Sequence, residues 1–274
     1  MMRVAFQGER GAYSEEAVAS FFGEVDVFPC STLRDVFVVV AAGGAERGVV
    51  PVENSQAGSI NETYDLLLAH ALFIAGELDL RIRHCLLALP GQTLEAIQKV
   101  YSHPQALAQC EAYLREHKLE SVPAYDTAGS AKLLVEQQMR GVAAIASRRA
   151  AQIYGLVILG EGIEANPANF TKFLALAVAP APRAAQCKTS IVFTTANRPG
   201  ALYRALGAFA TRAINLTKLE SRPRRELPWE YVFYVDFEGH QEDPPAAAAL
   251  AELAELTTFL RVLGSYPRSP TPLR

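Results

Sequence analysis

A change of pattern at residues 179–182 constrains the fold of this chain more than any other feature. The segment Ala179-Pro180-Ala181-Pro182 indicates a linker, because proline at such a break interrupts both helices and strands. Before the break, short strand-like and helix-like segments alternate. After it, the predicted order is strand, helix, two strands, helix and strand. The chain has 274 residues, which leaves room for two domains.

The first 180 residues predict an α/β domain, because strands and helices alternate along them. The predicted strands are Arg3–Gln7, Gly48–Val52, Leu72–Leu80, Arg83–Leu89, Lys99–Ser102 and Val142–Ala146. The predicted helices are Ser14–Phe22 with Ser14 as its N-cap, Ile60–His70, Gln105–His117 opened by Pro104, Ala131–Met139 and Arg148–Tyr154. In such an order the ligand-binding groups are expected in the loops that follow strands.

The segment after the linker predicts a smaller ferredoxin-like domain of βαββαβ order. Its predicted strands are Thr189–Thr195, Asn215–Ser221, Glu230–Phe237 and Phe259–Tyr266. Its predicted helices are Pro199–Arg212 and Pro244–Leu256.

Composition argues against several classes of protein. The net charge of −3 comes without a strongly basic run, so we expect no nucleic-acid partner. No apolar run is long enough for a bilayer span, and Arg3 leads directly into a strand without room for a signal peptide. The four cysteines and five histidines lack metal-ligand spacing, and no nucleotide-binding glycine motif is present. We therefore expect a cytosolic protein with no membrane contact, no cofactor and no metal.

Four polar segments of the first domain could carry chemistry. They are Glu53-Asn54-Ser55 with Gly58-Ser59, Ser102-His103-Pro104-Gln105, Asp126-Thr127-Ala128-Gly129-Ser130, and Asn169-Phe170-Thr171-Lys172-Phe173. Each alone fits a helix cap or an amphipathic strand. Together they offer hydroxyls, amides and helix-start N–H groups, which suit an anion. The last segment sets a hydroxyl and a cation between two aromatic rings, a combination that suits acid–base work on a small anion away from water.

These segments, in this order, resemble the prephenate dehydratase family, which includes the arogenate dehydratases of plants. The matching stretches are Gly11-Ala12-Tyr13-Ser14-Glu15, Pro51-Val52-Glu53-Asn54-Ser55, Ser102–Leu107, Asp126–Gly129 and Asn169–Phe173. Beyond the linker, Arg198–Leu202 and Leu219–Pro223 resemble the phenylalanine-binding segments of the family's ACT domain. The resemblance implies a two-lobed, periplasmic-binding-protein-like catalytic domain over residues 1–180 and a ferredoxin-like ACT domain over 187–274. The lobes would be 1–75 with 161–180, and 76–160.

The resemblance implies decarboxylating dehydration of prephenate to phenylpyruvate in L-phenylalanine biosynthesis. The implied catalytic residues are Thr171, Glu53, Asn54 and Gln105, with Thr171 as a hydrogen-bond donor to the departing hydroxyl. The implied substrate-binding residues are Ser55, Gly58, Ser102, Thr127, Ala128, Lys172 and Phe173. The family usually has arginine where this chain has Lys172, which keeps the charge but loses the bidentate fork.

The resemblance also implies inhibition by L-phenylalanine and a homodimer or tetramer formed through the ACT domain. The implied effector-binding residues, which would bridge two chains, are Asn197, Pro199, Gly200, Ala201, Leu202, Glu220, Ser221, Arg222 and Pro223. Two other functions remain open at this point. One is an arogenate dehydratase, whose substrate has an ammonium in place of the ketone. The other is a non-catalytic amino-acid sensor.

Overall fold

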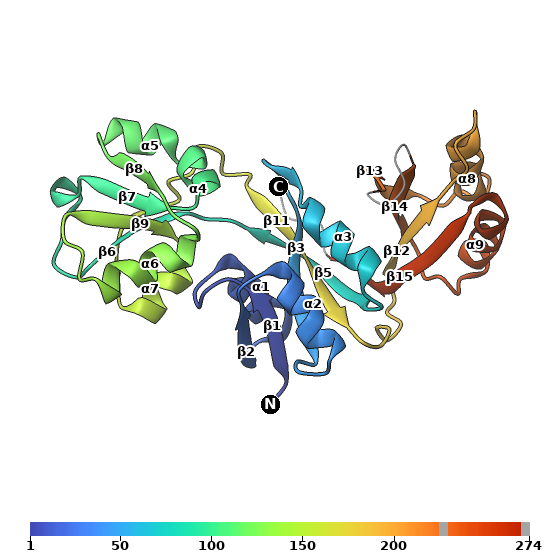
Figure 1. Ribbon diagram of the computed structural model, residues 1–274, viewed down its shortest axis with the longest axis horizontal. Helices are drawn as coiled ribbons and strands as arrows, with labels where there is room; N and C mark the ends of the chain where they lie inside the picture. The colour runs from blue at the N-terminus through green and yellow to red at the C-terminus, as the bar shows by residue number, and fades with distance from the viewer. Residues whose placement is uncertain (225–229, 270–274) are drawn as a thin grey trace. The chain divides into compact units, whose positions relative to one another are not determined.

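The computed structural model describes residues 1–224 and 230–269 of the chain (Figure 1). Contacts divide the chain into two compact units, the first of residues 1–64 and 78–173 and the second of residues 65–77 and 174 onward. Two mixed sheets with their helices account for most of the first unit, and an antiparallel four-stranded sheet belongs to the second. The predicted fold class is confirmed, whereas the predicted domain limits at residues 180 and 187 remain predictions.

The first sheet has the strand order β2-β1-β3-β11-β5, and the short strand β4 pairs with β3. Its strands are β1 (Arg3–Gln7), β2 (Asp26–Cys30), β3 (Arg47–Asn54), β4 (Gly58–Ser59), β5 (Phe73–Arg81) and β11 (Phe170–Ala177). Its helices are α1 (Tyr13–Phe22), α2 (Leu33–Ala41) and α3 (Asn61–Ala69). β1 runs parallel to β2 and β3, and its apolar side chains Val4 and Phe6 are fully buried with Val18 of α1. Parallel strands covered by helices need such apolar runs.

The second sheet has the order β10-β6-β9-β7-β8. Its strands are β6 (Cys85–Ala88), β7 (Lys99–Ser102), β8 (Glu120–Pro123), β9 (Val142–Ala146) and β10 (Val157–Glu161). Its helices are α4 (Pro104–Gln109), α5 (Glu111–Glu116), α6 (Thr127–Glu136) and α7 (Arg148–Tyr154), with a short 3₁₀ turn at Leu94–Ala96. β7 is parallel to β8 and β9, whereas β6 is antiparallel to β9 and β10.

The chain crosses between the first two sheets twice, at residues 82–84 and 162–169. The two crossings lie side by side, because Ile82 N donates to Asn169 O at 2.8 Å and Gly162 N donates to His84 O at 2.8 Å. The loop before α1 also contacts α7. A side chain at Gly11 would lie 2.7 Å from Ala150 Cα, and the φ of Gly11 is +87°, so both contact and conformation require glycine here.

The third sheet has the order β13-β14-β12-β15. Its strands are β12 (Cys187–Thr194), β13 (Leu216–Pro223), β14 (Tyr231–Glu238) and β15 (Phe259–Pro267), and its helices are α8 (Ala201–Ala210) and α9 (Pro244–Leu256). Phe209 of α8 and Leu253 of α9 share one apolar core with Ile191 and Phe237 of the sheet, so both helices cover the same face. The predicted βαββαβ order is confirmed.

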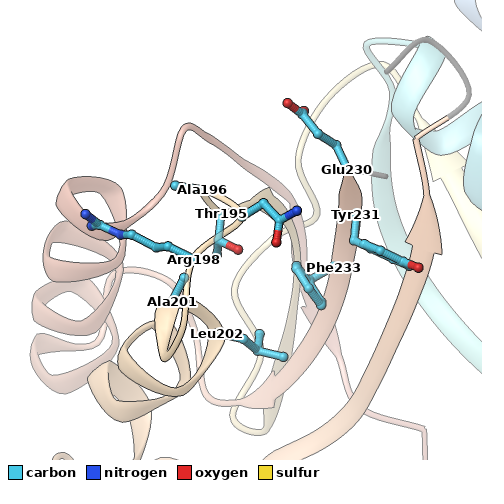
Figure 2. Close-up of a pocket in the computed structure, with 9 residues that line it drawn as sticks. Thr195, Ala196, Arg198, Ala201, Leu202, Glu230, Tyr231 and Phe233 are labelled. Atoms are coloured by element: carbon cyan, nitrogen blue, oxygen red, sulfur yellow. The ribbon is translucent and has the colours of Figure 1, made fainter. Parts of the chain in front are cut away.

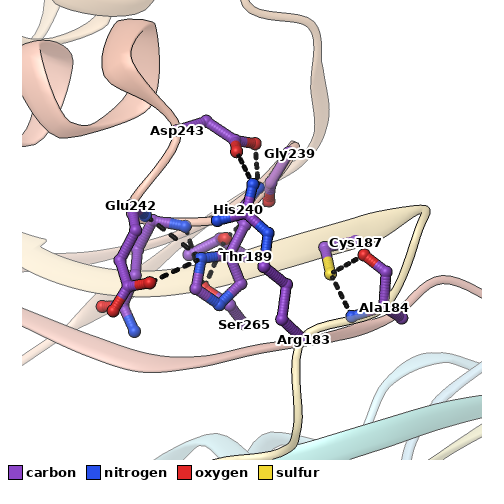
Figure 3. Close-up of polar contacts among 10 residues, drawn as sticks. Arg183, Ala184, Cys187, Thr189, Gly239, His240, Glu242, Asp243 and Ser265 are labelled. Atoms are coloured by element: carbon purple, nitrogen blue, oxygen red, sulfur yellow. Dashed lines mark hydrogen bonds and ion pairs between the residues drawn. The ribbon is translucent and has the colours of Figure 1, made fainter.

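Polar contacts hold the end of the linker against the third sheet (Figure 3). Arg183 pairs with Asp243, whose other oxygen accepts from His240 N at 2.8 Å. The hydrogen bond from His240 and the ion pair with Arg183 hold the pKa of Asp243 below its usual value. Cys187 Sγ, at the start of β12, donates to Ala184 O at 3.3 Å. The segment around residue 183 therefore folds with the sheet.

Three local predictions were wrong. Ser14 is not the N-cap of α1; the helix begins at Tyr13, and the buried carboxylate of Glu15 accepts from Gly11 N at 2.6 Å instead. The single helix predicted over Gln105–His117 is broken at Cys110 into α4 and α5. The segment Glu53–Ser59, expected as a loop between the strand Gly48–Val52 and the helix Ile60–His70, instead closes a short hairpin of β3 and β4. The elements β2, α2, β8 and β10 were not predicted.

Candidate active site

Pairing of β3 with β11 brings together two polar segments that are far apart in the sequence. Asn54 ends β3, while Asn169 and Thr171 bracket the start of β11. Ser55, which follows β3, links it to the start of β11. Its N–H donates to Phe170 O at 2.8 Å, and its Oγ accepts from Phe170 N at 2.9 Å. The predicted residues Asn54, Ser55 and Thr171 therefore lie in one place.

The orientation of the Asn54 amide is fixed by the backbone. Its Oδ1 accepts from the N–H groups of Gln56 and Ala57, both at 3.0 Å. Backbone N–H groups can only donate, so this end of the amide must be the oxygen. The Nδ2 end therefore faces Asn169 Oδ1 and Thr171 Oγ1, each at 2.9 Å.

The hydroxyl of Thr171 is an acceptor in its contact with Asn54. An amide Nδ2 only donates, so Thr171 Oγ1 must receive this hydrogen bond. The hydroxyl proton is then not used in that contact and is available to a second acceptor. Thr171 is 8% exposed, so this proton lies in a largely dry environment.

The same direction of donation extends from Asn54 toward the second sheet. Asn169 is 1% exposed, and its Nδ2 donates to Gln109 Oε1 at 3.0 Å. Gln109 Oε1 also lies 2.8 Å from Nε2 of His84, which is in the first crossing. Burial lowers the pKa of His84, so the ring is neutral at neutral pH. Because Gln109 Oε1 can only accept, the proton of the neutral ring is on Nε2.

This chain of amides forms one wall of a cavity of about 350 Å³. The residues that line the cavity are Gln56, Ala57, Gln105, Ala108, Gln109, Glu164, Ala165, Asn166 and Asn169. The predicted Gln105 is among them, exposed on α4, and Gln109 follows one helical turn later. Asn54 and Thr171 are not among the lining residues; Asn54 is hydrogen-bonded to Asn169 and to Thr171.

Other predicted residues lie elsewhere. Ser102 is fully buried, and its hydroxyl donates to Ile145 O at 2.7 Å. Thr127 is the first residue of α6, and its neighbours Asp126 and Gly129 line a second cavity of about 280 Å³. Ala128 and Phe173 are buried in the apolar core beside β1. Gly58 lies in the exposed hairpin.

Lys172 and Thr171 are neighbours in β11, and neighbouring side chains in a strand point to opposite faces of the sheet. Lys172 Nζ lies 2.8 Å from Asp79 Oδ1 of β5. The cation and the hydroxyl therefore do not share one face, and whether Lys172 contacts substrate remains a prediction. The same alternation separates Glu53 from Asn54 in β3.

Sequence reasoning missed Gln109, Asn169, His84 and Glu164. Gln109 could have been found, because it follows the predicted Gln105 by four residues in a predicted helix and so shares its face. Asn169 was part of a segment chosen for other residues. His84 and Glu164 carry no local signal, since their positions depend on the two crossings. Among the described residues, no group of three or more metal-ligating side chains forms a metal site, and no helix is long and apolar enough to cross a membrane.

The second unit has a pocket of about 170 Å³ between the start of α8 and the start of β14 (Figure 2). Leu202 of α8 faces Tyr231 and Phe233 of β14 across it. The predicted residues Asn197, Ala201 and Leu202 line this pocket. Gly200, with a φ of +76°, is the N-cap of α8. The other predicted segment, Glu220–Pro223, lies in the edge strand β13, where Arg222 pairs with Asp65 at 2.9 Å.

Comparison with known proteins identifies the catalytic and regulatory parts. The sequence profile of prephenate dehydratase matches residues 4–181, and the profile of the ACT domain matches residues 189–255. The chain belongs to the prephenate dehydratase family. Family membership makes it a prephenate or arogenate dehydratase, a carbon–oxygen lyase of phenylalanine biosynthesis with a regulatory ACT domain.

The relatives in this family include plant and bacterial proteins. Arogenate dehydratase 1 of Petunia hybrida is 47% identical over 99% of this chain and 68% of its own length. The solved structure of prephenate dehydratase from Arthrobacter aurescens, in complex with L-Phe, is 34% identical over 97% of this chain and 90% of that one, with a TM-score of 0.89. GqqA, described as a novel type of quorum quenching acylase, is 38% identical over 98% of both chains, with a TM-score of 0.91.

Proposed function

We propose that the chain converts prephenate to phenylpyruvate and that L-phenylalanine inhibits it through the ACT domain. In this reaction the bond between the ring and its carboxylate breaks, and its electron pair becomes a ring double bond. The bond from the opposite ring carbon to its hydroxyl breaks, so hydroxide leaves and takes up a proton to become water. The ring becomes aromatic, and no electron carrier is required.

The observation that carries the proposal is the direction of the hydrogen bonds around Thr171. Asn54 donates to Thr171 Oγ1, which leaves the threonine proton for the departing hydroxyl. Threonine alone is far too weak an acid to protonate a leaving group, so it serves as an oriented donor. Positioned proton transfer contributes about 10²–10⁴-fold to a rate.

The amides of the cavity suit the remaining needs of the substrate. Gln105 and Gln109 line the cavity and offer N–H donors to a carboxylate or ketone without bringing a negative charge. Decarboxylation is faster where water cannot stabilise the ring carboxylate. We propose that four predicted residues support the site without touching the substrate. Ser55 and Ser102 hydrogen-bond to neighbouring segments of backbone, and Ala128 and Phe173 fill the apolar core beside β1. Glu53 orients neighbouring residues, because an ionised carboxylate close to the substrate anion would be repelled.

The pocket of the second unit is the site we propose for L-phenylalanine. Backbone N–H groups at the start of α8, after Gly200, suit its carboxylate, and Leu202 and Phe233 suit its ring. A relative of this family was solved with L-Phe. β13 is the edge strand of the third sheet, which supports our proposal that Glu220–Pro223 completes the pocket of a second chain in a dimer or tetramer. A cytosolic location remains a prediction from the sequence.

Arogenate is a second candidate substrate, favoured by Glu164. This carboxylate lines the cavity and accepts from His84 N at 2.9 Å. A carboxylate there would attract the ammonium that arogenate has in place of the uncharged ketone of prephenate, whereas the side-chain carboxylate is common to both substrates. The reaction at the ring is the same for both substrates, so the role of Thr171 is unchanged.

Rates on prephenate and arogenate, measured side by side with and without L-phenylalanine, test these proposals. Faster release of phenylpyruvate, suppressed by L-phenylalanine, supports the first proposal, and preference for arogenate supports the second. Turnover of neither would contradict both and would leave an amino-acid sensor. Because GqqA is described as an acylase, the same preparation is also tested on an acyl amide. Hydrolysis that survives in Thr171→Ala would assign that activity to another site.

A further inference from the structure

His84 is a buried histidine with no part in the chemistry described above, yet it contacts α1, α4 and the second crossing between the sheets. It is 2% exposed and lies in the first crossing between the sheets. Its backbone N–H donates to Glu164, and its carbonyl accepts from Gly162 and Ile163 of the second crossing. Its ring lies between Tyr13 of α1 and Gln109 of α4.

The ring has different partners on its two nitrogens. Nε2 lies 2.8 Å from Gln109 Oε1, and Nδ1 lies 2.8 Å from the hydroxyl of Tyr13. Gln109 Oε1 cannot donate, so Nε2 carries the proton and Nδ1 is the acceptor. Burial raises the pKa of Tyr13 well above its usual value, so its hydroxyl keeps its proton. Two acceptors lie within reach of that hydroxyl, Arg83 O at 3.1 Å and His84 Nδ1 at 2.8 Å, and the contact with Nδ1 is the shorter. One tautomer therefore satisfies both contacts.

Gln109 Oε1 thus receives two donors, one from His84 and one from Asn169 Nδ2. With its oxygen held from two sides, the Gln109 amide cannot flip without leaving two buried N–H groups without an acceptor. An unsatisfied buried donor is destabilising, because it has lost its hydrogen bonds to water and gained none in the protein. The Nε2 end of the amide is then directed away from both donors, and Gln109 lines the cavity.

We propose that His84 is a positioning residue for the dehydratase reaction: as the neutral Nε2–H tautomer, held by Tyr13, it fixes the Gln109 amide with its N–H donors toward the substrate. Asn169 links Gln109 to Asn54, whose own orientation is fixed by the backbone N–H groups of Gln56 and Ala57. This inference rests on the proposed dehydratase reaction but not on the role proposed for Thr171. The contacts also tie the orientation of the amide to both crossings between the sheets.

The first test is activity with matched variants. His84→Gln keeps an N–H donor for Gln109, whereas His84→Leu removes it, and Tyr13→Phe removes the donor to Nδ1 without loss of the ring. We expect His84→Leu to lower kcat by roughly 10- to 100-fold with KM changed much less, as loss of positioning does. His84→Gln should retain most of the wild-type kcat. Tyr13→Phe should lower kcat by roughly a few-fold. His117→Leu, at an exposed histidine of the same sheet region, should have no effect.

A second variant pair tests whether His84 acts through Gln109. If it does, adding His84→Leu to Gln109→Leu costs little more than Gln109→Leu alone, whereas independent effects would multiply. Independent effects, or equal activity of wild type and His84→Leu, would overturn the proposal. If His84→Leu does not fold, His84→Gln and Tyr13→Phe still decide it, because full loss in His84→Gln with an intact fold contradicts a role based on donation.

The tautomer is a readout that does not depend on activity. We expect ¹⁵N NMR of the wild-type chain to show His84 neutral, with Nε2 protonated and Nδ1 not, and Tyr13→Phe to disturb that state. A cationic ring or the Nδ1–H tautomer at neutral pH would overturn the inference. If the expected tautomer is found but Thr171→Ala retains full activity, the proposed role of Thr171 fails while the positioning of Gln109 stands.

Discussion

Thr171 and Lys188 are both polar side chains buried beside a β-sheet, but their partners differ in charge. Thr171 ends a chain of neutral groups, Asn54, Asn169, Gln109 and His84. Lys188 of β12 is 6% exposed and pairs with two carboxylates, Glu77 and Asp236, the second at 3.0 Å. Ser190 donates to the other oxygen of Asp236, so this cluster is also connected.

The difference shows what each arrangement can do. Amides and a neutral histidine have a donor end and an acceptor end, so a chain of them has a direction that begins at backbone N–H groups and ends at a specified proton. Such a chain brings no net charge next to an anionic substrate. The ionic cluster has no such direction, but its opposite charges hold Glu77, β12 and β14 together away from water, because separating the charges leaves one of them unpaired.

Loss of the cation from the ionic cluster should have the largest effect. Lys188→Met leaves Glu77 and Asp236 buried without it, and breaking a buried ion pair in this way costs about 3–5 kcal/mol. We expect the free energy of unfolding of the second unit to fall accordingly in denaturant titrations. Lys99→Met is the matched control, since Lys99 and Glu120 are exposed and should change stability little. Equal stability of the two variants would show that the cluster does not hold the sheet.

Loss of the Thr171 hydroxyl should lower the rate of the reaction rather than the stability of the fold. We expect Thr171→Ala to lower kcat by at least about 10²-fold with little change in thermal stability. Thr171→Ser keeps the hydroxyl and should retain much of the activity. A kcat of Thr171→Ala near that of wild type would remove Thr171 from the mechanism.

The two regions should lose stability at opposite ends of the pH scale. Burial lowers the pKa of His84 in the folded state, so its protonation favours unfolding as pH falls below its usual value of 6.5. Burial alone would lower the pKa of Lys188, but Asp236 and Glu77 outweigh it and raise the pKa above 10.5. The contribution of the Lys188 ion pairs to the free energy of unfolding is therefore present below pH 10.5 and is lost as the pH rises through the folded-state pKa of Lys188.

Melting temperatures across pH separate these contributions. The acid decline should weaken in His84→Gln and persist in Lys188→Met, and the alkaline decline should do the reverse. If His84→Gln leaves the acid decline unchanged and Lys188→Met leaves the alkaline decline unchanged, other groups control the pH dependence of stability.

The smallest effect is expected for Lys172→Arg. Arginine keeps the charge and can pair with Asp79, so we expect kcat within about threefold of wild type, with KM unchanged or lower. Lys172→Met is the matched variant without charge and should be worse than Lys172→Arg. A large loss of kcat in Lys172→Arg would show that the site is built around lysine.

Much of the fold could be predicted because it depends on local patterns. Lys99–Ser102, Val142–Ala146 and Pro244–Leu256 were predicted to the residue, since their apolar periods and flanking residues lie within each segment. The break at Cys110 and the hairpin at Glu53–Ser59 were not predicted, because they depend on packing between elements. The four polar segments were singled out in the sequence, but no segment by itself indicated that Asn54 meets Thr171 while Asp126 and Gly129 line a different cavity.

The sequence by itself determined the α/β pattern of the first part, the βαββαβ order of the second, and the family to which the chain belongs. Those properties follow from periodicity, turn residues and ordered motifs, which depend only on residues that are near one another in the sequence or on their order. Only the tertiary structure decided which polar groups meet. Pairing of β3 with β11 joins Asn54 to Thr171, strand alternation turns Lys172 toward Asp79, and the paired crossings bring His84 to Gln109. A hydrogen bond needs two groups within about 3 Å, and that distance depends on how remote segments pack.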